Sequence, residues 1–186
     1  MKATSLSICL ALCTLPVLFF TGCSYNKPSP SPVKTFEMPA EASPPDAMTV
    51  NELLYIVNEL LGYEDESKKR FKKEDAEVFN LPASPERTEV LYLFMVGDLE
   101  IGLFADSERD GVISAYVRML FDYAMVEAYM MSFAGAFLAA LEPNEYEKML
   151  LSVVPADDDD PAESKTAYGE FWRVRYAKSL MNILPR

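Results

Sequence analysis

The fold is decided by residues 88–119, TEVLYLFMVGDLEIGLFADSERDGVISAYVRM. The first nine of them are rich in valine, leucine, tyrosine and phenylalanine, and apolar side chains then occupy every second position in 99–105 and 113–119. A period of two is typical of strands with one buried face. The pairs Gly97-Asp98 and Asp110-Gly111 offer tight turns between the segments. The stretch therefore predicts a three-strand antiparallel meander.

Two helices are predicted after the meander. Asp122 can cap a long apolar helix that runs to about Leu141, and a shorter helix opens at Pro143 and ends before Pro155. In the long helix, residues four apart form a small row, Ala124, Ala128, Ser132, Ala136 and Ala140, beside a large row, Met125, Tyr129, Phe133, Phe137 and Leu141. Three interpretations are open, because such rows pack in several settings: the domain core, a groove for a second copy or an apolar ligand, and a transmembrane helix. Glu127 argues against the last.

The C-terminal residues 168–184 fit two periods. Trp172, Val174 and Tyr176 alternate with other residues as in a strand, and residues 180–184 can return as a hairpin. A helical alignment is also tolerable. We favour strands, because Gly169 and the density of aromatic residues suit a sheet.

A helix precedes the meander. Thr49 and Glu52 form a capping box, and apolar residues then follow a helical period up to Gly62. Residues 64–79 carry acid-to-base pairs four apart and fit either a surface helix or a charged loop. Residues 49–186 are thus predicted to be a single α+β domain: an antiparallel sheet with helices packed on one face. Secretion chaperones have a similar element order, and by this analogy alone the domain is a binding or assembly module.

The residues before the domain predict a targeting signal and a tether. Apolar residues run from Leu6 to Phe20 behind Lys2, and small residues then lead to Cys23. This pattern resembles the precursor of a bacterial lipoprotein. The resemblance implies that residues 1–22 are removed, that Cys23 receives a diacylglycerol and is often acylated by a fatty acid such as palmitate, and that Ser24 directs the protein to the periplasmic side of the outer membrane. An uncleaved membrane anchor is the alternative, although the apolar run is short for a span.

Residues 24–48 separate Cys23 from the domain. Six prolines alternate there with serine, alanine and lysine, without an apolar period. Such a composition predicts a tether that does not fold, so residues 23–48 are assigned to the lipidated cysteine and its linker.

Charge and cysteine content narrow the classes of partner. The full chain has a net charge of −12, and without Lys2 it has 16 basic against 29 acidic residues, or −13. Nucleic acid is therefore not an expected partner. Cys9 and Cys13 lie within the signal, so the mature chain keeps one cysteine and can form no internal disulfide. The expected partners are the membrane, through the lipid, and an envelope protein or an apolar ligand.

The chain lacks histidine, which excludes histidine-based nucleophilic and zinc sites. Asp106, Glu108 and Asp110 match the first half of a calcium loop, but Val117 stands where a bidentate glutamate is required, and we expect a solvated hairpin turn. No cofactor and no catalytic residue are predicted. The leading hypothesis is a non-enzymatic lipoprotein that binds in the cell envelope; the alternatives are a carboxylate-dependent enzyme acting on envelope glycans and a purely structural lipoprotein.

Overall fold

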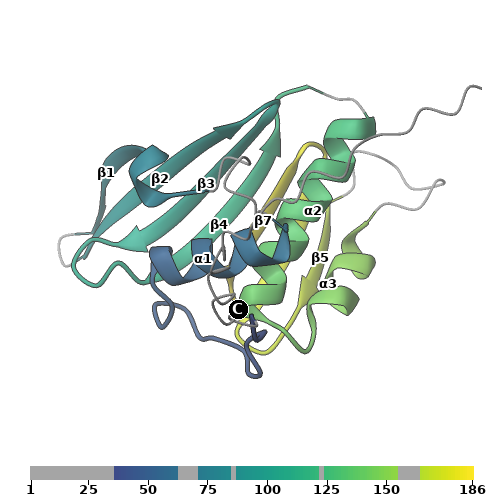
Figure 1. The fold of residues 1–186 in the computed structure, drawn as a ribbon, viewed down its shortest axis with the longest axis horizontal. Coiled ribbons are helices and arrows are strands. Elements are labelled where there is room, and N and C mark those ends of the chain that lie inside the picture. The colour runs from purple at the N-terminus through teal and green to yellow at the C-terminus, as the bar shows by residue number, and fades with distance from the viewer. Residues whose placement is uncertain (1–35, 63–70, 85–86, 122–123, 155–163) are drawn as a thin grey trace, which may run out of the picture. The chain divides into compact units, whose positions relative to one another are not determined.

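A computed structural model describes residues 36–62, 71–84, 87–121, 124–154 and 164–186 (Figure 1). These residues form an α+β fold that is dominated by an antiparallel sheet. The strands in these ranges are β1 (Glu77–Ser84), β2 (Arg87–Val96), β3 (Leu99–Asp106), β4 (Val112–Met119), β5 (Lys165–Tyr168), β6 (Trp172–Ala177) and β7 (Leu180–Pro185). The helices are α1 (Val50–Leu60), α2 (Ala124–Leu141) and α3 (Tyr146–Val153), with a 3-10 turn, η1 (Lys73–Asp75).

The strands lie in the order β1-β2-β3-β4-β7-β6-β5. Every neighbouring pair is antiparallel, so β1 to β4 form a meander. The chain then passes through α2 and α3 and returns with β5, β6 and β7, and β7 joins the sheet beside β4. The middle of the sheet therefore joins two segments that are far apart in the sequence.

One strand of the meander was not expected. The predicted strands correspond to β2, β3 and β4, whereas β1 begins inside the segment assigned to a surface helix or charged loop. That assignment is wrong from Glu77 onward, because Val78 and Phe79 pair with Tyr92 and Leu91. Residues 64–70 of the segment lie outside the described ranges. Pro82 concealed the strand, since proline is tolerated in a sheet mainly on an edge strand such as β1.

At the C-terminus the strand interpretation is confirmed and the helical one is wrong. β6 and β7 form a hairpin whose turn contains Lys178 at φ +53°. β5 pairs with β6 and adds a strand that was not predicted. Trp172, Val174 and Ile183 have no exposed surface, so this hairpin is part of the core.

The predicted start of α1 is confirmed. The Thr49 backbone N–H donates to Glu52 Oε2 at 2.9 Å, and the Glu52 N–H donates to Thr49 Oγ1 at 3.3 Å. The hydrogen bond from the Thr49 backbone and then that from its hydroxyl lower the pKa of Glu52. The helix stops before Gly62, whose φ of +68° suits glycine. Sequence and structure agree here because a capping box is a local signal.

The second half of α2 lies in the core. Phe133, Phe137 and Leu141 of the large row are buried, as are Ala136 and Ala140 of the small row. The first half is more open, since Tyr129 is 57% exposed. α2 contacts α1, α3, β4 and β7. Among the helices in the described ranges, none is both long enough and apolar enough to cross a membrane.

The helices cover part of the sheet. α2 contacts β3, β4 and β7, and α3 contacts β5 and β6. In Figure 1 these helices lie on the viewer's side of the sheet, while β1 and β2 extend beyond them. The helix-side residues of β3, namely Leu99, Ile101 and Leu103, are buried, whereas Val78, on the same side of β1, is 51% exposed.

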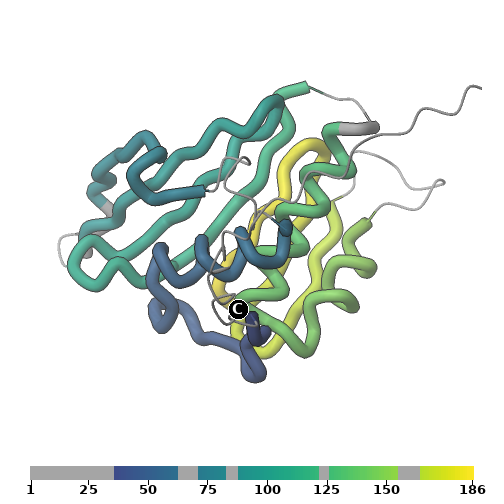
Figure 2. The backbone as a smooth tube through the Cα atoms, in the orientation of Figure 1, coloured from purple at the N-terminus to yellow at the C-terminus, as the bar shows by residue number. Residues whose placement is uncertain are grey.

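Residues 36–48, which we assigned to the tether, pack on the domain. The Ser43 N–H donates to the Leu141 carbonyl at 2.9 Å, and the Trp172 indole donates to the Ser43 carbonyl at 2.5 Å. The Asp46 N–H donates to the Val112 carbonyl at 2.8 Å. Figure 2 shows this segment, in purple, at the lower end of the molecule before α1. Its partners are distant in sequence, so its proline-rich composition alone did not reveal them.

Candidate functional site

The face of the sheet that points away from the helices carries a group of apolar side chains. Phe79, Leu91 and Phe104 lie opposite one another on β1, β2 and β3. Leu93 and Met95 follow Leu91 on β2 at intervals of two, so they point to the same side. We call this side of the sheet the open face, and these five residues the open-face cluster.

The open-face cluster is accessible to solvent. Phe79 is 40% exposed and Met95 is 58% exposed, and the other three are half-buried. None of the five belongs to the core or packs against it. From strand spacing, the cluster is about 10 Å wide and about 13 Å long. Large contiguous apolar patches on protein surfaces are typical of interaction sites, and this cluster is the candidate for such a site in the part of the chain that the structure describes.

A polar network borders the cluster. Tyr116 Oη donates to Glu100 Oε1 at 2.9 Å, and Arg118 Nη2 donates to Glu100 Oε2 at 2.6 Å. Burial and the hydrogen bond to Glu100 raise the pKa of Tyr116 to about 12. Gly102 makes room for the tyrosine ring, since a Cβ at this position would lie 2.1 Å from Tyr116 Cε1. Glycine is therefore required for the arrangement of the ring next to Phe104, whose centroid is 6.1 Å away.

The other end of the open face is basic. Arg173 and Arg175 on β6 are exposed and lie opposite Tyr168 and Thr166 of β5. Arg175 Nη2 donates to Ser164 Oγ at 3.3 Å. The open face thus changes from apolar at β1–β3 to positively charged at β6, in a chain whose net charge is −12.

Another group of polar side chains lies at the β3–β4 turn. Lys73 Nζ is 2.7 Å from Asp110 Oδ1, and Tyr92 Oη donates to the same oxygen at 3.0 Å. Burial lowers the pKa of Lys73, but its hydrogen bonds to Asp110 and Tyr92 raise it more, and the net shift is upward. These contacts hold η1 against the β3–β4 turn, and the charges of Lys73 and Asp110 neutralise each other.

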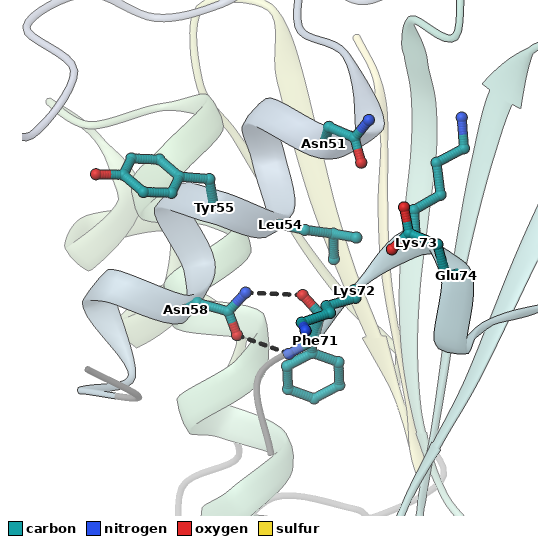
Figure 3. A pocket seen from close by; sticks show the side chains of 8 residues that line it. All are labelled: Asn51, Leu54, Tyr55, Asn58, Phe71, Lys72, Lys73 and Glu74. Carbon is teal, nitrogen blue, oxygen red and sulfur yellow. Dashed lines mark hydrogen bonds between the residues drawn. The ribbon is translucent and has the colours of Figure 1, made fainter. Parts of the chain in front are cut away.

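A shallow pocket of about 220 Å³ lies between α1 and η1 (Figure 3). Asn58 at its wall is buried, and both of its amide atoms are used: Nδ2 donates to the Phe71 carbonyl at 2.9 Å, and Oδ1 accepts from the Phe71 N–H at 2.8 Å. The pocket is smaller than the ~300 Å³ that is usual for small-molecule sites. Asn58 is therefore a structural residue that holds Phe71 against Phe94 and Phe133.

The calcium-loop candidates have separate tasks. Asp106 Oδ1 accepts from the backbone N–H groups of Glu108 and Arg109 at 3.0 Å and closes the β3–β4 turn. Asp110 is bound to Lys73 and Tyr92, and Glu108 is exposed. The candidates do lie in the strand-turn-strand setting that was expected. Across the described ranges, no cluster of three or more acidic, cysteine or histidine residues is arranged to hold a metal.

The buried carboxylate of Glu142 holds the C-terminal strands. Glu142 is 1% exposed, and its Oε1 accepts from the backbone N–H groups of Phe171 at 2.6 Å and Trp172 at 2.7 Å. Gly169 lies so close that a Cβ there would be 2.7 Å from the carboxyl carbon. Sequence reasoning missed Glu142, although an acid directly after a long apolar helix was a signal. The groups that donate hydrogen bonds to Glu142 are backbone N–H groups, so its role is structural.

Cys23, the predicted lipidation site, lies outside the described residues, as do residues 24–35 of the predicted tether. Comparison of the chain with protein-family profiles, with curated proteins and with solved structures found no match. The open-face cluster was also not found from the sequence, where Leu91 and Leu93 were read only as strand formers. The alternation along each strand was read correctly from the sequence. The signal that was overlooked is that β2 carries apolar residues on both of its faces, including the face that was expected to be polar.

Proposed function

We propose that this chain is a lipid-anchored protein of the bacterial cell envelope, and that the open-face cluster binds a protein partner without catalysis. The observation that carries the proposal is the exposure of Phe79 and Met95 beside three half-buried apolar residues. A protein is the favoured occupant because the cluster is bordered by the polar network of Glu100, Tyr116 and Arg118. Apolar centres with polar rims are typical of protein interfaces.

The helix layer supports this choice of surface. We propose that the helices serve as the structural side of the domain, which leaves the open face for binding. Trp172, Val174 and Ile183 are fully buried on the helix side, and none of the five residues of the open-face cluster belongs to that core. Truncating the cluster should therefore impair binding much more than folding.

The location of the protein rests on the lipoprotein resemblance. We propose that Cys23 carries the lipid on the periplasmic side of the outer membrane and that residues 24–35 supply the reach. A flexible linker of this length spans roughly 20 Å, which is enough to hold the domain clear of the headgroups. Mass spectrometry should find a diacylglycerol-modified peptide that begins at Cys23. An unmodified chain that still begins at Met1 would refute this part of the proposal.

The binding proposal is tested by photo-crosslinking the full chain in its native membranes. A photoreactive residue at Met95 should form a specific protein adduct, and the same residue at Leu151, which is 76% exposed on α3, should not. Leu93→Glu should abolish the Met95 adduct, because a carboxylate would be desolvated at the interface. Leu151→Glu is the matched control and should leave the adduct unchanged. Equal adducts at both positions, or adducts to lipid alone, would disprove a protein partner at this surface.

A further inference from the structure

On the basis of the proposed function, we infer that a single partner protein covers the open face from β1 to β6 and presents two regions of different chemistry. An apolar region contacts the open-face cluster, and a pair of carboxylates binds Arg173 and Arg175 on β6. Two features of the sheet point to such a partner: the unpaired charges of β6, and the register that aligns β6 with the cluster.

Arg173 and Arg175 are exposed cations that form no ion pair with a carboxylate of the described ranges. Arg175 Nη2 donates to a neutral group, Ser164 Oγ, at 3.3 Å. Arg118 on β4 is different, because its Nη2 lies 2.6 Å from Glu100 Oε2. At β6 the open face therefore presents two positive charges that await an acidic partner, in a chain whose net charge is −12.

The spacing of the two arginines suits a pair of carboxylates. Positions two apart in a strand point to the same side and lie about 7 Å apart. Acidic residues at alternate positions of an extended segment have the same spacing, and a guanidinium binds a carboxylate through two parallel hydrogen bonds. Tyr168 and Thr166 lie opposite the arginines on β5 and are exposed, so hydroxyl donors accompany both charges.

The register places the basic pair and the open-face cluster on one continuous surface. Residues opposite one another on neighbouring strands share a side of the sheet. One such row crosses β6, β7, β4, β3 and β2 through Arg175, Asn182, Tyr116, Gly102 and Leu93. Four strand spacings separate its ends, or about 19 Å. A standard interface of about 800 Å² per partner is roughly 30 Å across, so one partner can contact both ends.

A protein fits this surface better than an anionic membrane does. Glu77 lies opposite Leu93 on the open face, and Glu89 lies opposite Leu81. A layer of anionic headgroups would be attracted by β6 but repelled by these acids. A protein can place its carboxylates at β6 alone and apolar side chains at β1–β3. Such complementary charge gives an interface its specificity.

Zero-length crosslinking of the full chain in its native membranes tests the carboxylates. Arg173→Lys with Arg175→Lys keeps both charges and supplies amines. A carbodiimide activates a carboxylate, the amine attacks it, and an amide forms as the urea by-product leaves. Mass spectrometry should find an amide between position 173 or 175 and an acidic residue of the protein that is captured from Met95. Arg109→Lys, at the β3–β4 turn, is 78% exposed and is the matched control that should give no such amide.

The possible results of this experiment separate the contact at β6 from the proposed function. A Met95 adduct without an amide would overturn the acidic contact and leave the proposed function standing. Amides without a Met95 adduct would contradict the proposed function and, with it, the shared partner. Amides only to carboxylates of the same chain, such as those of residues 157–160, or only to a different protein, would also overturn the shared partner.

Charge reversal provides the second readout. Arg173→Glu with Arg175→Glu should lower the yield of the Met95 adduct at least tenfold, because carboxylates would then face carboxylates. Lys72→Glu with Lys148→Glu makes the same change in net charge at exposed positions outside the open face and should leave the yield unchanged. Equal melting temperatures would show that both variants fold. An undiminished Met95 adduct in the arginine variant would overturn the contact at β6.

Discussion

The two ends of the sheet are built from similar alternating strands but differ in their covering. At the β5–β7 end, Trp172, Met181 and Ile183 have no exposed surface, because α2 and α3 lie over them. At the β1–β2 end, Val78, which lies on the same side of the sheet as these residues, remains 51% exposed. Alternation therefore determines which side chains share a face, while the helices determine which face becomes core.

The largest expected effect is a difference in the free energy of unfolding between variants at the two ends of the sheet. Trp172→Ala should lower the free energy of unfolding by about 3–5 kcal/mol, because it leaves a large cavity in the core. Phe79→Ala at the other end should change it by less than about 1 kcal/mol, since its side chain is already in contact with water. Urea unfolding of both variants provides the measurement. Equal losses would mean that Phe79 on the open face is as firmly packed as Trp172 in the core.

A smaller loss is expected at Glu142, which holds the covered end. Glu142→Ala should cost about 2–3 kcal/mol, because the N–H groups of Phe171 and Trp172 would be buried without an acceptor. Glu142→Gln keeps a side-chain oxygen and should lose less. Glu145→Ala, which removes an exposed pair with Lys148, should cost no more than about 0.5 kcal/mol. Thermal unfolding distinguishes the three variants, and identical melting temperatures would contradict the assigned role of Glu142.

Gly102→Ala probes the border between the two ends. A Cβ at this position meets the ring of Tyr116, so the ring must move and its hydrogen bond to Glu100 must weaken. We expect a loss of about 1–2 kcal/mol, as in other overpacked sites. Adding Tyr116→Ala should make the glycine substitution nearly neutral, and a double-mutant cycle measures this coupling. Simple additivity would show that the ring does not require the glycine.

The smallest effect concerns α1, whose first N–H is tied to the β3–β4 turn through the Asp110 carbonyl at 3.0 Å. Thr49→Ala should cost about 1 kcal/mol at neutral pH. The folded pKa of Glu52 lies below its ordinary value of 4.5, so its contribution is present above that value and is lost as pH falls through the folded pKa. The gap between Glu52→Gln and the unsubstituted chain should therefore close in acid. A gap that stays constant over the acid range would contradict the capping box.

Local signals were read correctly from the sequence, and long-range ones were not. The capping box at Thr49 and the turn at Gly97 depend on residues a few positions apart, and both predicted elements are present. β1 was missed because Val78 and Phe79 stand between charged residues and a proline, and their strand partners lie on β2. Residues 36–48 were assigned to a tether from their composition. Their packing was not foreseen, because Ser43 and Asp46 form hydrogen bonds with Leu141, Trp172 and Val112, which are distant in the sequence.

The sequence by itself determined the α+β class, the alternation of the central strands and the cap of α1, because side-chain period and capping are properties of neighbouring residues. Only the tertiary structure decided that β7 joins β4, that Glu142 reaches the N–H groups of Phe171 and Trp172, and that the open-face cluster lies outside the core. These features depend on how the helices and strands pack, and one helix layer can cover only one side of a sheet. The candidate binding surface therefore lies on the face that this packing leaves open.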